Sequence, residues 1–223
     1  MHAALGEARS VLNVGAGAGS YEPGDRKVVA VEPDPVMRAQ RTTPAIDAVA
    51  EALPFEDGAF DAAMATVTVH QWRDVDRGLA ELRRVARGPV VVLTFDPDHL
   101  TDFWLAHYIP DVIEHERGRF PSLPRIAAGL GGGAAIEPVP IPIDCTDGFN
   151  EAYYARPEAF LDPAVRAGQS MWRFIDDAEL ADGLGRLESD LADGLWDRAH
   201  GALRSQPVYE GSLRLLTAQP PAG

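Results

Sequence analysis

The chain has 223 residues, and its hydrophobic fraction of 46% is ample for the core of one α/β domain with an insertion. With 34 acidic against 20 basic residues, the formal net charge of −14 argues against nucleic acid or an anionic membrane as a partner, since phosphate binding needs clustered Lys and Arg. The single cysteine, Cys145, rules out a disulfide framework within the chain and suits a reducing cytoplasm.

The first predicted elements are two short strands joined by a glycine-rich turn. Ser10–Val14 is an apolar run, Gly15–Arg26 is a loop, and Val28–Val31 is a second apolar run that is followed by a carboxylate, Glu32. Glycine is needed where the backbone takes a positive φ or approaches a ligand closely. A carboxylate accepts hydrogen bonds from both hydroxyls of a ribose. The pattern therefore predicts a loop that holds a ligand containing a nucleoside.

Helices and strands alternate after Glu32. Asp34 followed by Pro35 predicts the start of a helix that runs to about Arg41. The next expected elements are a strand over Ala45–Ala50, a strand over Phe60–Val69, a helix with Val75, Leu79, Leu82 and Val85 on one face that is capped by Asp74, and a buried strand over Val90–Phe95. This alternation predicts a doubly wound α/β sheet, mostly parallel, with ligands at the carboxyl ends of its strands.

The glycine spacing and a second motif carry a resemblance to a known family. After Gly15 and Gly17 the third glycine, Gly19, falls one residue earlier than in the dinucleotide fingerprint, where Ser20 stands instead. This spacing, together with the loop over residues 53–55 (Leu-Pro-Phe), resembles the class I S-adenosylmethionine-dependent methyltransferases, in their quinone-biosynthesis-like branch. The resemblance covers roughly residues 10–96. It implies a seven-stranded, Rossmann-like sheet and S-adenosylmethionine as the cofactor.

Two positions depart from the family pattern, which usually has acidic residues where this chain has Asn13 and Val49. The amino group of the cofactor then needs a negative partner elsewhere or backbone carbonyls. The backbone of Ala50 and Glu51 is expected to read the adenine edge. Tyr21 suits either the methionine end of the cofactor or a packing role. The cofactor-binding residues that the resemblance implies are Asn13, Gly15, Gly17, Gly19, Tyr21, Glu32, Pro33, Ala50, Glu51, Leu53 and Thr66.

His70 is the candidate catalytic residue, because it follows a predicted strand at its carboxyl end. Histidine titrates near neutral pH and so suits removal of a proton from an acceptor hydroxyl; a histidine that only anchors the loop is the alternative. Asp96 and His99 form a second candidate pair. His107 and His115 are expected at the surface or in a lid, and no HxxE or CxxC pattern predicts a metal site.

Beyond Asp96 the sequence becomes aromatic and rich in proline. We expect two short helices within Thr101–Gly118 and another over Ser122–Leu130. Alternating prolines restrict Val139–Ile143 to an edge strand or an extended segment. Further on we expect a long helix capped by Asp176 with Leu180, Leu184, Leu187, Leu191 and Leu195 on one face, and a last strand over Val208–Thr217. The aromatic residues in this part belong to the core or, as a set, line an apolar substrate pocket: Trp104, Tyr108, Tyr153, Tyr154 and Trp172.

We expect a single methyltransferase domain over residues 1–223, with a cofactor-binding core at 8–97, an insertion that covers the substrate at 98–175, and a C-terminal helix and strand at 176–223. The insertion falls between the fifth and sixth strands. Relatives usually carry covering helices before the glycine loop, whereas only ten residues precede the core of the first strand here. Either the chain is shorter than its relatives, or Leu100–Leu130 closes over the site with Gly131–Gly133 as the hinge.

The predicted function is transfer of a methyl group from S-adenosylmethionine to a small organic molecule, through an oxygen, nitrogen or carbon nucleophile. An apolar part of that molecule would suit the aromatic insertion. Two alternatives stay open: a protein that binds the cofactor without methylating, which shares every cofactor residue, and an NAD(P)-dependent oxidoreductase, which shares the strand–glycine–strand–acid pattern. No apolar run approaches the length of a membrane span, and no signal sequence is recognisable. We expect a cytoplasmic monomer or homodimer.

Overall fold

The structure is a computed structural model, and it describes residues 1–220. Its contacts divide the chain into two compact units. The first unit comprises Met1–Phe95, Phe120–Glu137 and the chain from Arg214, and the second comprises Asp96–Arg119 and Pro138–Leu213. This grouping joins residues 120–137, which were expected in the insertion, to the cofactor-binding half. The single domain of the sequence analysis stays a prediction.

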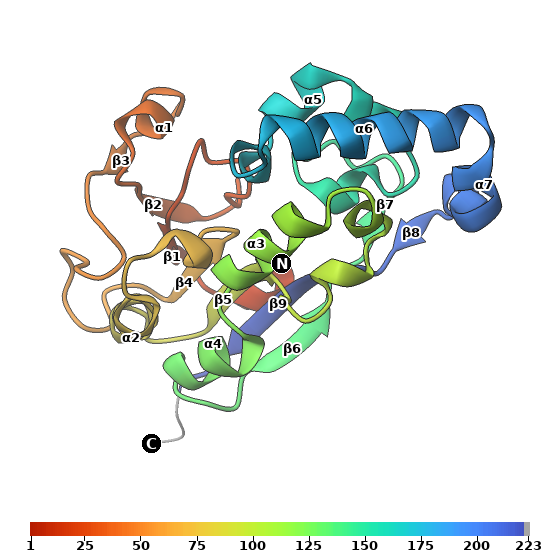
Figure 1. Cartoon of the computed structure of the whole chain (residues 1–223). Coiled ribbons are helices and arrows are strands. Elements are labelled where there is room, and N and C mark those ends of the chain that lie inside the picture. Colours follow the sequence, from red (N-terminus) through yellow and green to blue (C-terminus); the bar gives the residue numbers. More distant parts are fainter. Residues whose placement is uncertain (221–223) are drawn as a thin grey trace. The chain divides into compact units, whose positions relative to one another are not determined.

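The strands and helices of the described residues are labelled in Figure 1. The strands are β1 (Ser10–Val14), β2 (Lys27–Val31), β3 (Ala45–Ile46), β4 (Ala62–Thr66), β5 (Val90–Phe95), β6 (Ala135–Pro138), β7 (Ile141–Pro142), β8 (Val208–Tyr209) and β9 (Leu213–Ala218). The α-helices are α1 (Pro35–Ala39), α2 (Val75–Val85), α3 (Pro110–Arg119), α4 (Leu123–Gly129), α5 (Pro163–Ala167), α6 (Asp177–Ala192) and α7 (Leu195–His200). Short 3-10 turns fill several of the connections, including His2–Leu5 and Val69–Gln71.

The central sheet has seven strands in the order β3-β2-β1-β4-β5-β9-β6. The pairs β1–β2, β1–β4, β2–β3 and β4–β5 are parallel. From β1 the chain first builds outward through β2 and β3, and then returns to place β4 on the other side of β1. Ligands of doubly wound sheets bind at such a reversal, outside the carboxyl ends of the strands. The predicted fold class is confirmed.

The core of the first unit lies between the sheet and two helices, α2 and α4. Every residue of β4 and β5 is buried, which confirms the prediction of fully buried parallel strands for the second of them. Leu79 and Leu82 of α2 share one apolar cluster with Leu123 and Ile126 of α4. Asp74 caps α2 by accepting a hydrogen bond from the amide of Arg77, as the sequence predicted.

Several predicted boundaries in the first unit were too wide. The strand expected over Ala45–Ala50 pairs only at its first two residues. The strand expected over Phe60–Val69 is shorter at both ends, since Phe60 makes an isolated bridge to Ala86 and Val67 has a φ of 50° that interrupts the extended backbone. The first helix ends at Ala39 rather than near Arg41.

Two predicted elements of the C-terminal part, the long helix and the last strand, are each divided in the structure. Gly194, with a φ of 66°, separates α6 from α7, so Leu195 starts a new helix and lies 44% exposed. The last strand is split into β8 and β9, because the amide of Ser212 donates to both carboxylate oxygens of the buried Glu151 (2.9 and 3.0 Å). The extended segment predicted over Val139–Ile143 is likewise divided, and β7 pairs with β8 in a separate small sheet.

Aromatic side chains form the core of the second unit. Trp104 stacks edge-on against Trp196 and Phe160, and its indole nitrogen donates to the carbonyl of Tyr154 at 3.0 Å. Burial, with a hydrogen bond to Asp190, raises the pKa of Tyr108. Of the five aromatic residues proposed to line a substrate pocket, the structure buries Trp104, Tyr108 and Tyr154 in this core.

Candidate functional site

The glycine loop follows the buried strand β1 and runs between the ends of β2 and β4. Gly15, Gly17 and Gly19 have φ angles of 67°, 50° and 94°, which side chains rarely adopt. The amides of Gly15 and Ala16 both donate to the carbonyl of Val31 (2.9 and 3.0 Å), so the turn is anchored on the last residue of β2. A Cβ atom on Gly15 would lie 2.1 Å from the hydroxyl oxygen of Thr68. The loop therefore needs glycine there for both conformation and space.

Glu32 lies directly after β2 and is 7% exposed. Its carboxylate accepts hydrogen bonds from the amide of Gly17 at 2.8 Å and from the amide of Asp34 at 2.9 Å. An ionised carboxylate offers about four lone-pair positions. Two of them thus fix the side chain between the glycine loop and the start of α1, and two can serve a ligand.

A cavity of about 570 Å³ opens at this carboxyl edge of the first unit. It is lined by Gly15, Glu32, Pro33, Asp34, Val49, Ala50, Glu51, Ala52, Thr68, Gln71, Trp72, Arg73, Asp74 and Arg77. Five of the predicted cofactor residues are among them: Gly15, Glu32, Pro33, Ala50 and Glu51. The other predicted residues, Asn13, Gly17, Gly19, Tyr21, Leu53 and Thr66, do not line it.

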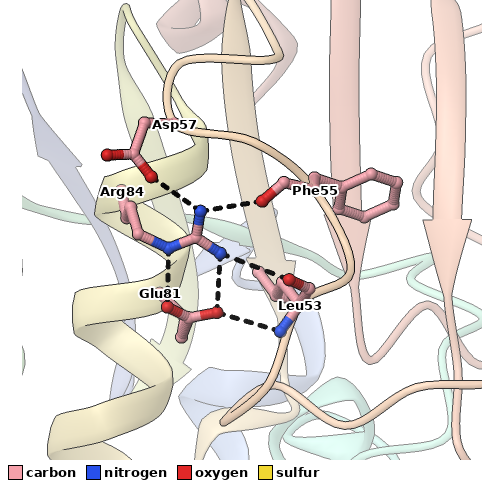
Figure 2. A network of polar contacts seen from close by, with 5 residues as sticks. All are labelled: Leu53, Phe55, Asp57, Glu81 and Arg84. Carbon is pink, nitrogen blue, oxygen red and sulfur yellow. Dashed lines mark hydrogen bonds and ion pairs between the residues drawn. The ribbon is translucent and has the colours of Figure 1, made fainter.

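The loop of Leu53, Pro54 and Phe55 is held by a polar network from α2, shown in Figure 2. Arg84 donates to the carbonyls of Leu53 and Phe55, and Glu81 accepts from the amide of Leu53 at 2.9 Å. The hydrogen bond from Arg84 lowers the pKa of Glu81. Since both backbone groups of Leu53 are engaged in this network, its proposed part in binding is to fix the loop beside the cavity.

Glu51 lines the cavity, and its side chain is engaged apart from the backbone role that was predicted for it. Its side chain accepts hydrogen bonds from the amides of Arg73 (2.7 Å) and Asp74 (3.1 Å), at the entry to α2. The carboxylate thus joins two walls of the cavity. The backbone of Ala50 and Glu51 remains the part proposed to face an adenine, next to Val49, which is 45% exposed.

Thr66 and Tyr21 lie beside the cavity rather than in it. Thr66 is the last residue of β4 and is 9% exposed. Val67, which follows, is the one non-glycine residue with a positive φ within residues 1–220, and a β-branched residue there is strained. The half-buried Tyr21 accepts a hydrogen bond from the ring of His2 on its carbonyl (2.9 Å), so the loop is tied to the N-terminal 3-10 turn.

His70 lies in the 3-10 turn after β4, as its predicted place requires. Its ring stacks on Phe120 with centroids 4.3 Å apart, and Phe120 in turn meets Phe95 edge-on at 5.5 Å. The neighbouring Gln71, 3.4 Å from His70 between side-chain nitrogens, lines the cavity. His70 itself does not line the cavity; it is held by an aromatic ring next to Gln71, which does, so the structure leaves both the base and the anchoring role open.

The second candidate pair, Asp96 and His99, also lies together in the second unit, with 3.8 Å between carboxylate and ring nitrogen. His99 is closer to Asp102, at 3.0 Å. His107 and His115 are exposed, as predicted.

Within residues 1–220, no three His, Cys, Asp or Glu side chains are arranged to hold a metal ion. No helix in the same residues is long and apolar enough to cross a membrane.

Two charged residues behind the glycine loop were not singled out from the sequence. The guanidinium of Arg41, whose side chain is 1% exposed, pairs with the carboxylate of Glu22 at 2.6 Å. Arg41 also donates to the carbonyls of Ala16 (3.2 Å) and Gly17 (3.0 Å). No local pattern marks this contact, because Arg41 lies 19 residues from Glu22 and 24 to 25 residues from the carbonyls of Gly17 and Ala16.

A larger and more open groove of about 800 Å³ lies at the amino ends of the strands. It is lined by the N-terminal turn and by residues that include Arg9, Asp61, Arg87 and Glu137. Asp61 is engaged there in tying β1 to β4, since it accepts from the amide and the hydroxyl of Ser10 (2.9 and 3.0 Å). Ligands of this fold bind at the opposite edge, so the smaller cavity is the candidate site.

Comparison with known proteins finds similarity to methyltransferases. Residues 12–92 match a family described as Methyltransferase domain. A segment of 60 residues is 38% identical to the uncharacterized protein YafE of Escherichia coli (strain K12), and the match spans 25% of this chain and 29% of that protein.

Among solved structures, the chain is similar to a proposed methyltransferase from an antibiotic biosynthesis pathway of Anabaena variabilis, with 27% identity, a TM-score of 0.86, and coverage of 94% of this chain and 90% of that one. It shares the fold of geranyl diphosphate C-methyltransferase from Streptomyces coelicolor, whose structure contains S-adenosyl-L-homocysteine, with 13% identity, a TM-score of 0.52, and coverage of 98% and 73%.

Proposed function

We propose that the chain is a class I S-adenosylmethionine-dependent methyltransferase and that it transfers the methyl group of this cofactor to an acceptor. The acceptor is a small organic molecule with an apolar part, which attacks through oxygen, nitrogen or carbon. The quinone-biosynthesis-like branch, which the sequence suggested, stays a prediction.

The observation that carries the proposal is the position of Glu32. Glu32 lines a cavity whose size suits a nucleoside, together with Gly15, and its carboxylate has acceptor positions left beyond its bonds to Gly17 and Asp34. A ribose diol donates two hydrogen bonds and so satisfies them. The residues present therefore fit S-adenosylmethionine, with its ribose on Glu32 and its adenine toward Val49–Ala52.

Two further observations support a small acceptor. The net charge of −14 is unfavourable for a polyanionic acceptor such as nucleic acid. The similar protein from Anabaena variabilis is described as a methyltransferase of an antibiotic biosynthesis pathway, which favours a small acceptor.

When bound, S-adenosylmethionine supplies a methyl group on a positively charged sulfur: the acceptor's electron pair forms the new bond to the methyl carbon while the carbon–sulfur bond breaks. The residues of the chain contribute chiefly by binding and orientation. Glu32 and the glycine loop fix the ribose. His70, stacked on Phe120, accepts the proton when the acceptor loses one during attack.

Calorimetry with S-adenosylhomocysteine and, separately, with NAD tests the cofactor. We expect S-adenosylhomocysteine to bind, and Glu32→Gln to weaken its binding by about 1–3 kcal/mol, the usual range for hydrogen bonds to a charged group. Asp47→Asn is the matched control, since it also replaces a carboxylate by an amide just after a strand of the same sheet. The side chain of Asp47 is 70% exposed and does not line the cavity. Binding of NAD alone, or equal affinity in Glu32→Gln, would be evidence against the proposal.

Methyl transfer is tested separately with S-adenosylmethionine labelled in its methyl group and a panel of small hydroxyl, amine and activated-carbon compounds. Label in a small product supports the proposed function. If S-adenosylhomocysteine binds and no compound in a broad panel is labelled, the alternative of a protein that binds the cofactor without methylating is favoured.

A further inference from the structure

The side chain of Asn13 is buried with one of its polar atoms unsatisfied. Asn13 lies in β1, is 1% exposed, and pairs through its backbone register with Ala30 and Met64 of the neighbouring strands. Its amide nitrogen donates to Glu22 at 3.0 Å, whereas its amide oxygen has no partner among the described residues. A buried polar atom without a hydrogen bond is unfavourable, because it has lost its bonds to water and gained none in return. Such an atom calls for an explanation, and Asn13 lies only two residues before Gly15, which lines the cavity, so a donor from a bound ligand is one.

Glu22 presents a second acceptor next to Asn13. Both hydrogen bonds that its side chain accepts within residues 1–220 go to Oε1, from Asn13 and from Arg41. The other oxygen, Oε2, lies beside the loop, 3.4 Å from where a Cβ of Gly19 would be. Because Gly19 has no side chain, none lies between its backbone and this oxygen.

Arg41 fixes Glu22 in this orientation. Its guanidinium donates to three backbone carbonyls, those of Ala16, Gly17 and Thr43, as well as to Glu22. The ion pair with Arg41 offsets part of the cost of holding the charged side chain of Glu22 at 15% exposure. Arg41 is therefore a positioning residue.

The path of the cofactor leads to this place. With the ribose on Glu32 and the adenine toward Val49–Ala52, the nucleoside fills the cavity, and the glycine loop forms its rim at Gly15. Asn13 lies two residues before this rim, at the carboxyl half of β1, so an amino-acid end that carries an ammonium and a carboxylate would reach it from the nucleoside position. An ammonium is a donor of three hydrogen bonds and needs acceptors.

We propose that Asn13 and Glu22 together bind the α-ammonium of the cofactor, through Oδ1 of the amide and Oε2 of the carboxylate. The charge that Asn13 lacks is supplied nine residues later in the chain and is connected to it by the hydrogen bond between the two side chains. This inference rests on the proposed function, and it assigns a part of the cofactor that the Glu32 site does not contact.

The test uses a ligand that lacks the group in question. Calorimetry compares S-adenosylhomocysteine with its deamino analogue, from which only the α-amino group is missing, on the full chain. We expect the native protein to prefer S-adenosylhomocysteine by roughly 10-fold or more, the factor for a hydrogen bond to a charged group. We expect Glu22→Gln and Asn13→Ala each to lose most of this preference while binding the deamino analogue with nearly native affinity.

Two controls and the second test variant separate the outcomes. Asp25→Asn removes a nearby exposed carboxylate and should leave the preference unchanged. Glu32→Gln should weaken both ligands by the same factor, because the ribose is common to both. If Glu22→Gln does not fold, since it leaves Arg41 without its carboxylate, Asn13→Ala decides. A native protein without preference, or variants that keep it, would overturn the inference while leaving the proposed function intact; failure of both ligands to bind would refute the proposed function as well.

Discussion

Replacing Gly15 by alanine is the sharpest single perturbation of the glycine loop. The backbone of Gly15 is left-handed, with a φ of 67°, and an alanine adopts this conformation at a free-energy cost roughly 1–2 kcal/mol higher than glycine does. In addition, the new Cβ would lie 2.1 Å from Oγ1, 2.8 Å from Cβ and 2.8 Å from Cγ2 of Thr68. Overpacking of this kind costs about 1–3 kcal/mol, because the neighbour or the backbone must move. We therefore expect Gly15→Ala to lower the free energy of unfolding by about 2–5 kcal/mol and to abolish most binding of S-adenosylhomocysteine.

The two contributions can be separated in a double-mutant cycle measured by urea denaturation. Thr68→Ala removes two of the three close atoms, so in the Gly15→Ala background it should recover part of the overpacking cost and none of the conformational cost. Gly24→Ala is the matched control, because a Cβ there meets nothing within 4 Å, and it should stay within about 0.5 kcal/mol of the native protein. Native stability and affinity in Gly15→Ala would refute the account of the loop.

Three other predictions concern catalysis, pH and closure. His70→Ala should lower turnover about 10²–10⁴-fold with little change in cofactor affinity, and full turnover would leave His70 as an anchoring residue. Hydrogen bonds from Ser10 hold the pKa of Asp61 well below its ordinary value, so its stabilisation is complete above that value and is lost as the pH falls below about 4. The difference in unfolding free energy between the native protein and Asp61→Asn should accordingly shrink between about pH 5 and pH 2; a constant difference would contradict this. If Leu100–Leu130 closes the site, S-adenosylhomocysteine with substrate should raise its protection from hydrogen exchange together with that of Gly15–Gly19; a rise in the loop alone would exclude this lid.

The parts of the fold that could be predicted are those determined by residues close together in the sequence. Ser10–Val14 and Val90–Phe95 were predicted to the residue, because each is an apolar run bounded by a turn signal. Asp34 and Asp74 were recognised as helix caps, since the capping side chain and the helix start are adjacent in sequence. Strand ends were less predictable, because the departure at Val67 depends on tertiary packing.

The residues of the candidate site likewise fall into those that a local sequence pattern marks and those that it does not. Gly15 and Glu32 stand in a recognisable spacing, and the structure brings both to one cavity. Glu22 and Arg41 carry no such signal, since their importance arises only when the chain returns after α1 and places the guanidinium behind the glycine loop. The split of the last strand at Gly211 has a similar origin: a Cβ there would lie 2.5 Å from the carboxylate of Glu151, far away in sequence.

The most direct test of the central claim is a crystal structure of the protein with S-adenosylhomocysteine. The account predicts the ribose hydroxyls at hydrogen-bond distance from the Glu32 carboxylate, about 2.6–3.2 Å, with the adenine against Val49–Ala52 and the glycine loop beside the sulfur. A ligand that occupies another part of the molecule, or a ribose that does not contact Glu32, would contradict it.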